Sequence, residues 1–219
     1  MPRARARALL FDLDGTLVDS LGDIAAAMNH ALAAFGWPRH GLEDFRRFIG
    51  EGVEVLAQRC SPPGAAAETH RLELIAAYQR RYAEHLFDAT HPYPGVLDLV
   101  AELRARSVPL GVLSNKPDEP TRRICEALFP AGSFVCVQGQ LPDVPRKPDP
   151  SAALALAARL GHAARDVAFI GDTAVDMHTA VAAGMLPVGV SWGFRPAELY
   201  ETGAALVVER ADELLEICA

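Results

Sequence analysis

Two carboxylates stand two positions apart in the stretch FDLDGTLVDS, which covers residues 11–20. The preceding run, Ala8-Leu9-Leu10, is apolar enough to form a buried strand, so Asp12 and Asp14 come at its end. Side chains alternate between the two faces of a strand, and these two therefore point to the same side. Two negative charges this close repel each other, so their placement indicates that both carboxylates have a function. The pair, followed at once by Gly15, predicts a functional site.

Other polar residues follow apolar runs further along the chain. Ser114, Asn115 and Lys116 come after residues 110–113, and Asp172 and Asp176 come after residues 167–171. Lys147 lies in a proline-rich loop, residues 145–150. In open parallel sheets, ligands bind outside the carboxyl ends of the strands, where residues distant in sequence converge. We expect five side chains to share one crevice there: Asp12, Asp14, Ser114, Lys147 and Asp172.

Each of these acids also has a plainer interpretation. The two N-terminal aspartates resemble the start of a calcium-binding loop, but an EF-hand requires glycine at its sixth position, and this chain has Leu17 there. Asp172 is also well placed to cap the helix that follows it, and Asp176 to lie on the solvated face of that helix. These alternatives stay open for Asp172 and Asp176 on the sequence alone.

The pattern of apolar runs predicts an α/β fold. Short apolar runs alternate with helical patterns, as a parallel sheet with crossover helices on both faces requires. We therefore expect a Rossmann-like sheet core. The expected strands cover residues 8–11, 109–113, 133–137, 167–170, 187–190 and 205–208.

Residues 18–91 interrupt this alternation, because they indicate one helix after another and no convincing strand. One apolar stripe begins at Ile24 and ends near Gly36, and a second is expected at Leu72, Ile75, Gln79, Tyr82 and Leu86. The prolines and glycine of residues 91–95 suit a hinge. We therefore predict a helical cap domain, residues 18–91, inserted into a catalytic core that comprises residues 1–17 and 92–219.

Composition and charge narrow the classes of partner. The chain has 219 residues, half of them hydrophobic, and a formal net charge of −7, which argues against a broad basic surface for nucleic acid or an anionic membrane. The apolar run behind the basic N-terminal residues is too short for a membrane span, so these residues indicate a solvated tail. The four cysteines form no Cys-x-x-Cys pair and are expected to be reduced, in a cytoplasmic protein.

Four short motifs, in order, resemble those of the haloacid dehalogenase-like hydrolases, most of which are phosphatases. They are Asp12-Leu13-Asp14-Gly15-Thr16, Ser114-Asn115, Lys147-Pro148 and the segment 171–176, GDTAVD. Segments 18–20, 49–53, 114–117 and 190–193 are further similar to the phosphoglycolate phosphatase branch. Relatives often carry acidic residues where this chain has Val137-Gln138-Gly139-Gln140, so it departs from the pattern there.

The resemblance implies a mechanism and assigns roles to the residues. Asp12 is implied to attack phosphorus and form an aspartyl-phosphate, and Asp14 to act as general acid and then general base. Mg²⁺ is implied to bind the Asp12 and Asp172 carboxylates and the Asp14 backbone carbonyl. Further implied roles are catalysis by Ser114 and Lys147, phosphate binding by Gly15, Ser114, Asn115 and Lys147, and a supporting position beside the metal for Asp176.

The implied substrate is a small phosphorylated metabolite, with phosphoglycolate as first choice. A sugar phosphate, a nucleotide or pyrophosphate remains an alternative, as does a sugar phosphomutase with the same motifs. A dehalogenase is less consistent with the sequence, because that chemistry needs no metal and leaves Asp14 unexplained. A binding protein without activity is possible on any fold, but this chain retains every reactive residue. We expect a monomer or a homodimer.

Overall fold

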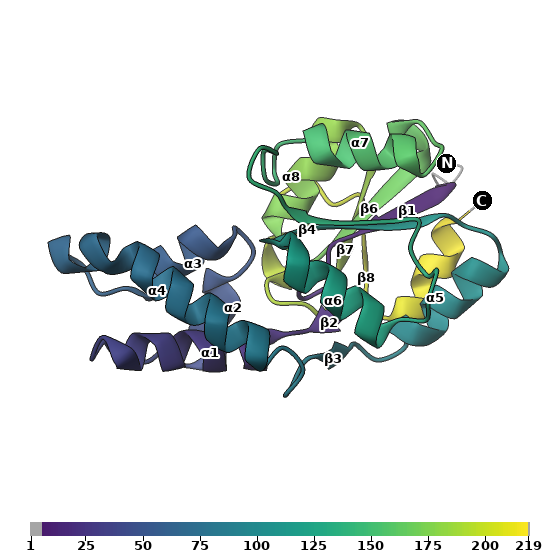
Figure 1. The fold of residues 1–219 in the computed structure, drawn as a ribbon. Coiled ribbons are helices and arrows are strands. Elements are labelled where there is room, and N and C mark those ends of the chain that lie inside the picture. Colours follow the sequence, from purple (N-terminus) through teal and green to yellow (C-terminus); the bar gives the residue numbers. More distant parts are fainter. Residues whose placement is uncertain (1–5, 219) are drawn as a thin grey trace.

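The computed structural model describes residues 6–218, apart from the side chains of residues 65–67. The basic tail expected at the N-terminus therefore lies, for residues 1–5, outside the described residues. Six parallel strands form one sheet in the order β5-β4-β1-β6-β7-β8 (Figure 1). The strands are β1 (Ala8–Phe11), β4 (Leu110–Pro117), β5 (Cys136–Gln140), β6 (Val167–Gly171), β7 (Leu186–Val190) and β8 (Leu206–Val208). The predicted parallel α/β sheet is confirmed.

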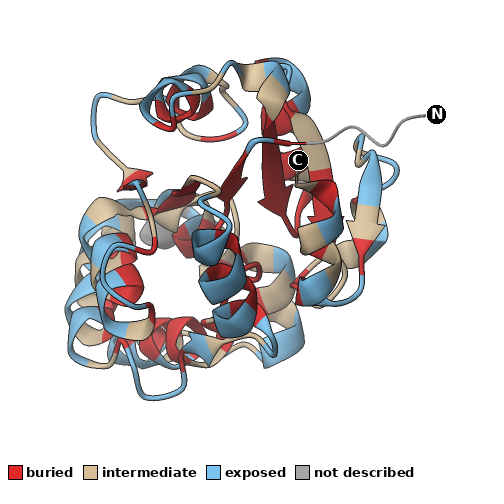
Figure 2. Ribbon diagram, turned by 90° about the vertical axis from the view of Figure 1, so that its right-hand side faces the viewer, coloured by how far each residue is buried: buried red, intermediate tan, exposed pale blue. Residues whose placement is uncertain are grey.

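Helices cover both faces of this sheet, and the alternation along β1 explains why. Leu9 and Phe11 pack into the hydrophobic cluster on the side of α5 and α6, whereas Ala8 and Leu10 pack into the cluster on the side of α7 and α8. Figure 2 shows the strands buried between these layers. The helices are α5 (Val96–Ala105), α6 (Asp118–Leu128), α7 (Ser151–Arg159) and α8 (Ala174–Ala183), with 3₁₀ helices η1 (Ala164–Asp166), η2 (Pro196–Glu198) and η3 (Ala211–Ile217).

Two strands differ from their predicted bounds by more than one residue, for different reasons. Strand β4 continues through the polar residues 114–116, which are buried although they are hydrophilic, because this end of the strand faces the candidate site. Strand β5 begins at Cys136 rather than Ser133, because Ser133 closes a turn on Pro130 and Val135 is largely exposed. Apolar runs alone therefore place a strand end wrongly where polar residues continue the strand into the site, as in β4, and where the strand lies at the edge of the sheet, as in β5.

Four helices follow the first strand: α1 (Leu21–Ala34), α2 (Leu42–Phe48), α3 (Val53–Cys60) and α4 (Ala65–Glu84). They stand apart from the sheet as a separate layer in Figure 1. The expectation of no strand in this region was wrong at its ends, since β2 (Val18–Asp19) and β3 (His91–Pro92) form a two-stranded antiparallel ribbon. This ribbon connects the sheet to the four helices in both directions of the chain. The division into a cap domain and a catalytic core stays a prediction.

The second apolar stripe was right for Ile75 and Tyr82, which are buried, and wrong for Leu72 and Gln79, which are exposed. Leu72 is 79% exposed, and the buried face instead carries Leu74, Ile75, Tyr78 and Tyr82. Helix α4 packs chiefly against α1, and that contact selects the face. Leu86, which was also expected on this helix, is buried but lies beyond its end at Glu84.

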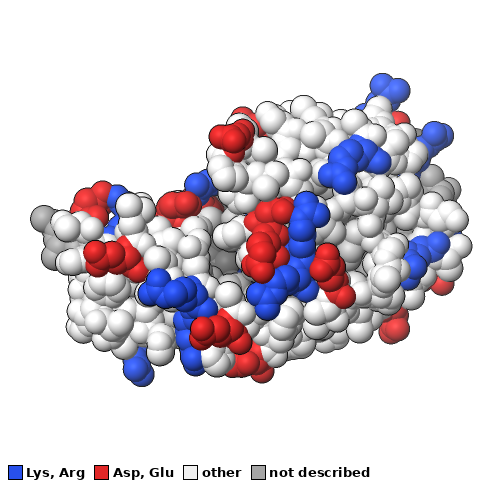
Figure 3. Space-filling model, in the orientation of Figure 1, with Lys and Arg blue, Asp and Glu red and all other residues white. Residues whose placement is uncertain are grey.

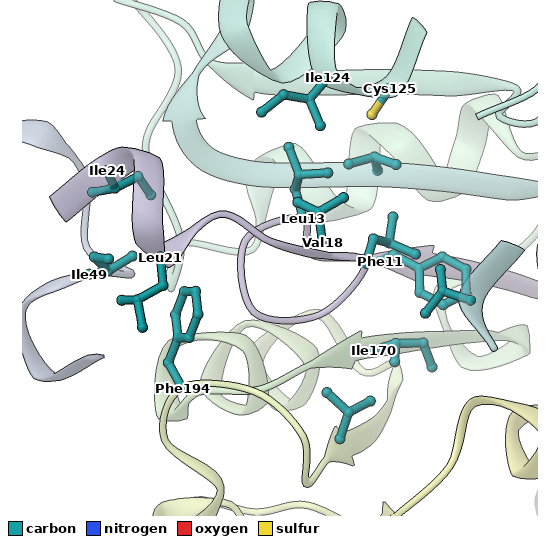
Figure 4. Packing of buried hydrophobic residues seen from close by; sticks show 14 of the residues in the cluster. Phe11, Leu13, Val18, Leu21, Ile24, Ile49, Ile124, Cys125, Ile170 and Phe194 are labelled. Atoms are coloured by element: carbon teal, nitrogen blue, oxygen red, sulfur yellow. The ribbon is translucent and has the colours of Figure 1, made fainter. Parts of the chain in front are cut away.

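Buried side chains join the helical layer to the core. In Figure 4, Phe194 lies close to Leu21 and Ile49, and all three belong to one hydrophobic cluster. Asp23, buried in α1, accepts hydrogen bonds from the backbone N–H groups of Ala89 and Thr90, at 2.8 to 3.1 Å. These contacts fix the base of α1 against the chain segment that returns to the sheet.

The surface carries both signs of charge. On the face seen in Figure 3, Lys and Arg side chains lie among Asp and Glu side chains. Across residues 6–218, no helix combines the length and the apolar character that a membrane crossing demands. The cysteines at positions 60, 125, 136 and 218 are all free. The absence of nucleic-acid binding, the oligomeric state and the cytoplasmic location stay predictions.

Candidate active site

Asp12 lies at the carboxyl end of β1, in the centre of the sheet. Its backbone N–H donates to the carbonyl of Ile170 in β6, which extends the pairing of the two strands by one residue. Its carboxylate oxygen Oδ1 accepts a 2.7 Å hydrogen bond from the Leu13 N–H and lies 3.0 Å from Lys147 Nζ. The Asp12 side chain is thus held in one orientation at the floor of the site.

Three buried carboxylates meet here. Oxygen atoms of Asp12, Asp172 and Asp176 lie within 4.8 Å of one another. Asp172, at the end of β6, accepts hydrogen bonds from Thr16 Oγ1 at 3.0 Å and from the Phe194 N–H at 2.8 Å. The structure therefore brings Asp12 and Asp172 together as predicted and adds Asp176 as a full member of the cluster.

The electrostatics of this cluster favour a bound cation. Burial raises the pKa of Asp12 to about 7, against the lowering effect of Lys147. Burial, together with repulsion from Asp176 and Asp12, raises the pKa of Asp172 well above its ordinary value. Three oxygen ligands in a buried, electron-rich pocket fit a hard divalent metal, which would relieve this repulsion. The residues present therefore fit a divalent metal ion.

Lys147 supplies the cationic side chain beside the cluster. Its Nζ lies 2.7 Å from Asp176 Oδ1 and 3.0 Å from Asp12 Oδ1, and its side chain is almost completely buried. Burial alone would lower the pKa of Lys147, but the two ion pairs raise it above its ordinary value. The Asn115 amide holds the Lys147 backbone, accepting from its N–H at 2.9 Å and donating to its carbonyl at 3.0 Å.

Asn115 and Asp176 have other contacts than the sequence suggested. The second contact of the Asn115 Nδ2 group is the carbonyl of Gly50, at 3.1 Å, so both of its N–H donors are engaged within the protein.

Asp176 is 1% exposed and accepts hydrogen bonds from the Thr173 N–H and hydroxyl, which places Thr173 rather than Asp172 at the N-cap of α8. The solvated and capping alternatives for Asp176 and Asp172 were therefore wrong.

Asp14 lies next to Asp12 in sequence but has different partners. Its carboxylate lies 2.7 and 2.9 Å from Lys116 Nζ through its two oxygens, and it accepts a 2.6 Å hydrogen bond from Ser20 Oγ. Ser20 directly precedes α1, but its hydroxyl donates to Asp14 instead of capping the helix. The Asp14 carboxylate is thus directed away from the acidic cluster, and the predicted metal contact of its backbone carbonyl stays a prediction.

Two glycines allow the loops around Asp172 to approach closely. Gly15 has φ +84°, in the region that side chains avoid, and a Cβ there would overlap the Asp172 carboxylate. A Cβ on Gly193 would overlap the Asp172 side chain and the Gly15 carbonyl. The sequence flagged Gly15 for phosphate binding, which stays a prediction; the structure shows that its small size makes room for Asp172.

A cavity of about 50 Å³ lies between this edge of the sheet and the cap helices. Asp12, Asp14 and Ser114 line it from the core, and Tyr78 of α4 lines it from the cap. Sequence reasoning missed Tyr78 because it placed Leu72 and Gln79, rather than Leu74 and Tyr78, on the buried side of α4. The four-residue spacing of Leu74, Tyr78 and Tyr82 was the available signal.

The model of the haloacid dehalogenase-like hydrolases matches residues 6–184 of this chain. The chain belongs to this family. It is therefore a hydrolase of the haloacid dehalogenase-like type, and the resemblance drawn from its motifs is confirmed.

Individual members of the family are similar over nearly the whole chain. The phosphoglycolate phosphatase of Pseudomonas putida is 32% identical over all of this chain and 82% of that protein, and that of Escherichia coli (strain K12) is 35% identical over 88% and 84%. Among solved structures, a family member from Streptococcus pneumoniae has a TM-score of 0.86 at 25% identity, covering 96% of this chain and 97% of its own. A protein from Lactobacillus delbrueckii subsp. bulgaricus, provisionally named phosphoglycolate phosphatase, has a TM-score of 0.89 at 32% identity, covering 98% and 99%.

Proposed function

We propose that this haloacid dehalogenase-like hydrolase is a Mg²⁺-dependent phosphatase that converts 2-phosphoglycolate to glycolate and inorganic phosphate. The names of the relatives support the substrate. The observation that carries the reaction type is the pairing of two differently placed carboxylates: Asp12 is fixed against the acidic cluster, and Asp14 is turned toward the cavity wall. One can serve as nucleophile and the other as acid, because their surroundings differ.

In the first step, an Asp12 oxygen attacks phosphorus and the bond from phosphorus to the ester oxygen breaks. Asp14 gives its proton to the leaving glycolate oxygen, so the product departs as an alcohol. In the second step, Asp14 takes a proton from water, whose oxygen attacks phosphorus and breaks the bond to Asp12. Phosphate leaves, and Asp12 is restored as a carboxylate.

Several residues prepare the site for this chemistry. Lys147, held by Asp176 and by the Asn115 amide, supplies positive charge next to the Asp12 oxygen that bears the phosphoryl group. Ser114, buried at the cavity wall, provides a hydroxyl donor for a phosphate oxygen. We propose that Asn115 acts by positioning the Lys147 loop, because its own donors are engaged.

Asp12, Asp172 and Asp176 are the side chains that would hold Mg²⁺, a hard cation that prefers oxygen ligands. When bound, the metal offsets the negative charge that the nucleophile and the phosphate bring together. The fit rests on the raised pKa values of Asp12 and Asp172, which show how poorly the buried cluster tolerates its own charge.

The variant Asp12→Asn tests the proposal, because an amide has nearly the same size but cannot attack phosphorus. With ³²P-labelled 2-phosphoglycolate and Mg²⁺, the wild-type enzyme should release one phosphate per glycolate and carry transient label after rapid acid quench. Asp12→Asn should do neither, while its circular dichroism stays unchanged. Undiminished turnover in the variant, or retention of phosphate on a rearranged product, would contradict the proposal.

A further inference from the structure

Lysine is rare in this chain and confined to the site. The sequence has 21 basic residues, of which only Lys116 and Lys147 are lysines, and every other one is arginine. Both lysines are buried, although lysine normally lies on the surface. Lysine differs from arginine in carrying a compact charge with three donors, which suits binding to a small anion. Lys147 serves the acidic cluster, whereas the proposed reaction gives Lys116 no task.

Lys116 is held rigidly at the wall of the cavity. Its Nζ contacts both oxygens of Asp14, and it lies 4.8 Å from the centre of the Tyr82 ring in α4. The two Asp14 contacts engage two of its three N–H donors, which leaves one. The Lys116 side chain is 4% exposed, so its charge is little screened by water.

Lys116 is also the only cationic side chain among the residues that line this cavity. The cap contributes apolar side chains to the lining, together with the Tyr78 ring: Ile24, Ile49, Val53 and Leu56. A leaving group rich in hydroxyls would find few partners there, and unpaired buried hydroxyls cost free energy. The cavity therefore suits a short leaving group with one anionic group.

The position of that anionic group in the substrate is limited by the contact between Lys116 and Asp14. The ester oxygen must reach the Asp14 carboxylate, which Lys116 Nζ already contacts at 2.7 and 2.9 Å. Because Nζ contacts both Asp14 oxygens, an ester oxygen at hydrogen-bond distance from either of them lies within about 6 Å of Nζ. A carboxylate on the carbon next to the ester oxygen can span this distance to Lys116, so a leaving group as short as glycolate is sufficient.

We infer that Lys116 is the specificity-determining residue of the site and binds a carboxylate on the carbon that carries the phosphate ester, so that the substrates are phosphate esters of short 2-hydroxy acids. This inference rests on the proposed phosphatase function and deepens it. The carboxylate accepts a charge-assisted hydrogen bond from the remaining N–H of the Lys116 ammonium group. Esters that lack the carboxylate miss this contact, and those that carry it one carbon further away must fit a longer leaving group into the same small cavity.

The test compares Lys116→Met with the wild-type enzyme on three esters of similar size. These are 2-phosphoglycolate, ethyl phosphate, which lacks the carboxylate, and 3-phosphopropionate, which carries it one carbon further. We expect the wild-type preference in kcat/KM for 2-phosphoglycolate over ethyl phosphate to fall by about 10- to 100-fold in the variant, mainly through KM. Arg122→Met, which removes an exposed cation outside the cavity, should keep the wild-type preference.

The ratio of kcat/KM values for the esters shows whether Lys116 recognises the substrate carboxylate or only supports Asp14. If Lys116→Met loses the same factor on all three esters, Lys116 serves only Asp14 or the phosphate, and the inference is overturned. It is likewise overturned if the wild-type enzyme does not distinguish 2-phosphoglycolate from 3-phosphopropionate.

Binding to a variant without turnover separates this inference from the proposed function. By calorimetry with Mg²⁺, Asp12→Asn should bind 2-phosphoglycolate more tightly than ethyl phosphate, and Asp12→Asn with Lys116→Met should bind both alike. If the wild-type enzyme hydrolyses none of the esters, the proposed function fails, whereas equal binding of the two esters by Asp12→Asn overturns the role of Lys116.

Discussion

The metal-free protein should lose stability as the pH rises from 5 to 8, which is unusual for a protein rich in carboxylates. The cause is Asp12, whose pKa burial raises from 3.8 to about 7. Between these two values the folded protein keeps a proton that the unfolded chain has released. The unfolded state then binds fewer protons, so the free energy of unfolding falls as the pH rises.

The size of the effect follows from the two pKa values. Each pH unit between them lowers the free energy of unfolding by about 1.4 kcal/mol, and the decline ends just above pH 7. From pH 5 to pH 8, Asp12 alone therefore removes on the order of 2 to 3 kcal/mol. Asp172, whose pKa is also raised, acts in the same direction. A bound divalent cation stabilises the ionised carboxylates and should remove this decline.

Urea unfolding in chelator at pH 5, 6, 7 and 8, followed by circular dichroism, measures the effect. Other groups also titrate in this range, so Asp12→Asn is the matched control, and its curve should lack the contribution of Asp12 to the wild-type decline, which is on the order of 2 to 3 kcal/mol. Saturating Mg²⁺ should raise the stability of the wild type more at pH 8 than at pH 5. Parallel pH curves for wild type and Asp12→Asn would refute the reasoning.

Three substitutions test other parts of the site. Asp14→Asn should lower kcat for 2-phosphoglycolate by about 10²- to 10⁴-fold but spare 4-nitrophenyl phosphate, whose leaving group needs no proton; equal losses would exclude Asp14 as the acid. Asp172→Asn should raise the half-saturating Mg²⁺ concentration more than about 10-fold without lowering the metal-free Tm, because one repelling charge is gone; an unchanged Mg²⁺ titration would remove it from the ligands. Gly193→Ala should lower the Tm by several degrees, because its methyl group overlaps the Asp172 side chain; an unchanged Tm would show that the loop has room.

The sequence by itself determined the sheet and the composition of the site. Strand β1 has the bounds that its apolar run predicts, and the residues at the ends of β1, β4 and β6 converge as the rule for parallel sheets requires. This part was predictable because strand patterns are local and because parallel strands bring their carboxyl ends to one edge. The family motifs then pointed to the reactive residues at that edge.

The tertiary structure alone decided which partner each reactive side chain has. Asp12 and Asp14 both line the cavity, yet one meets Lys147 and the other Lys116 and Ser20. The strand alternation that predicted a common direction no longer holds there, because β1 ends at Phe11 and the chain turns at Gly15.

Asp176 and the face of α4 were decided in the same way. Asp176 joins the acidic cluster because the first turn of α8, capped by Thr173, places its carboxylate beside Lys147. Helix α4 presents Tyr78 to the cavity because its packing on α1 selects that face. Helical periodicity constrains the spacing of side chains along a helix, whereas the direction they face depends on neighbours that lie far away in the sequence.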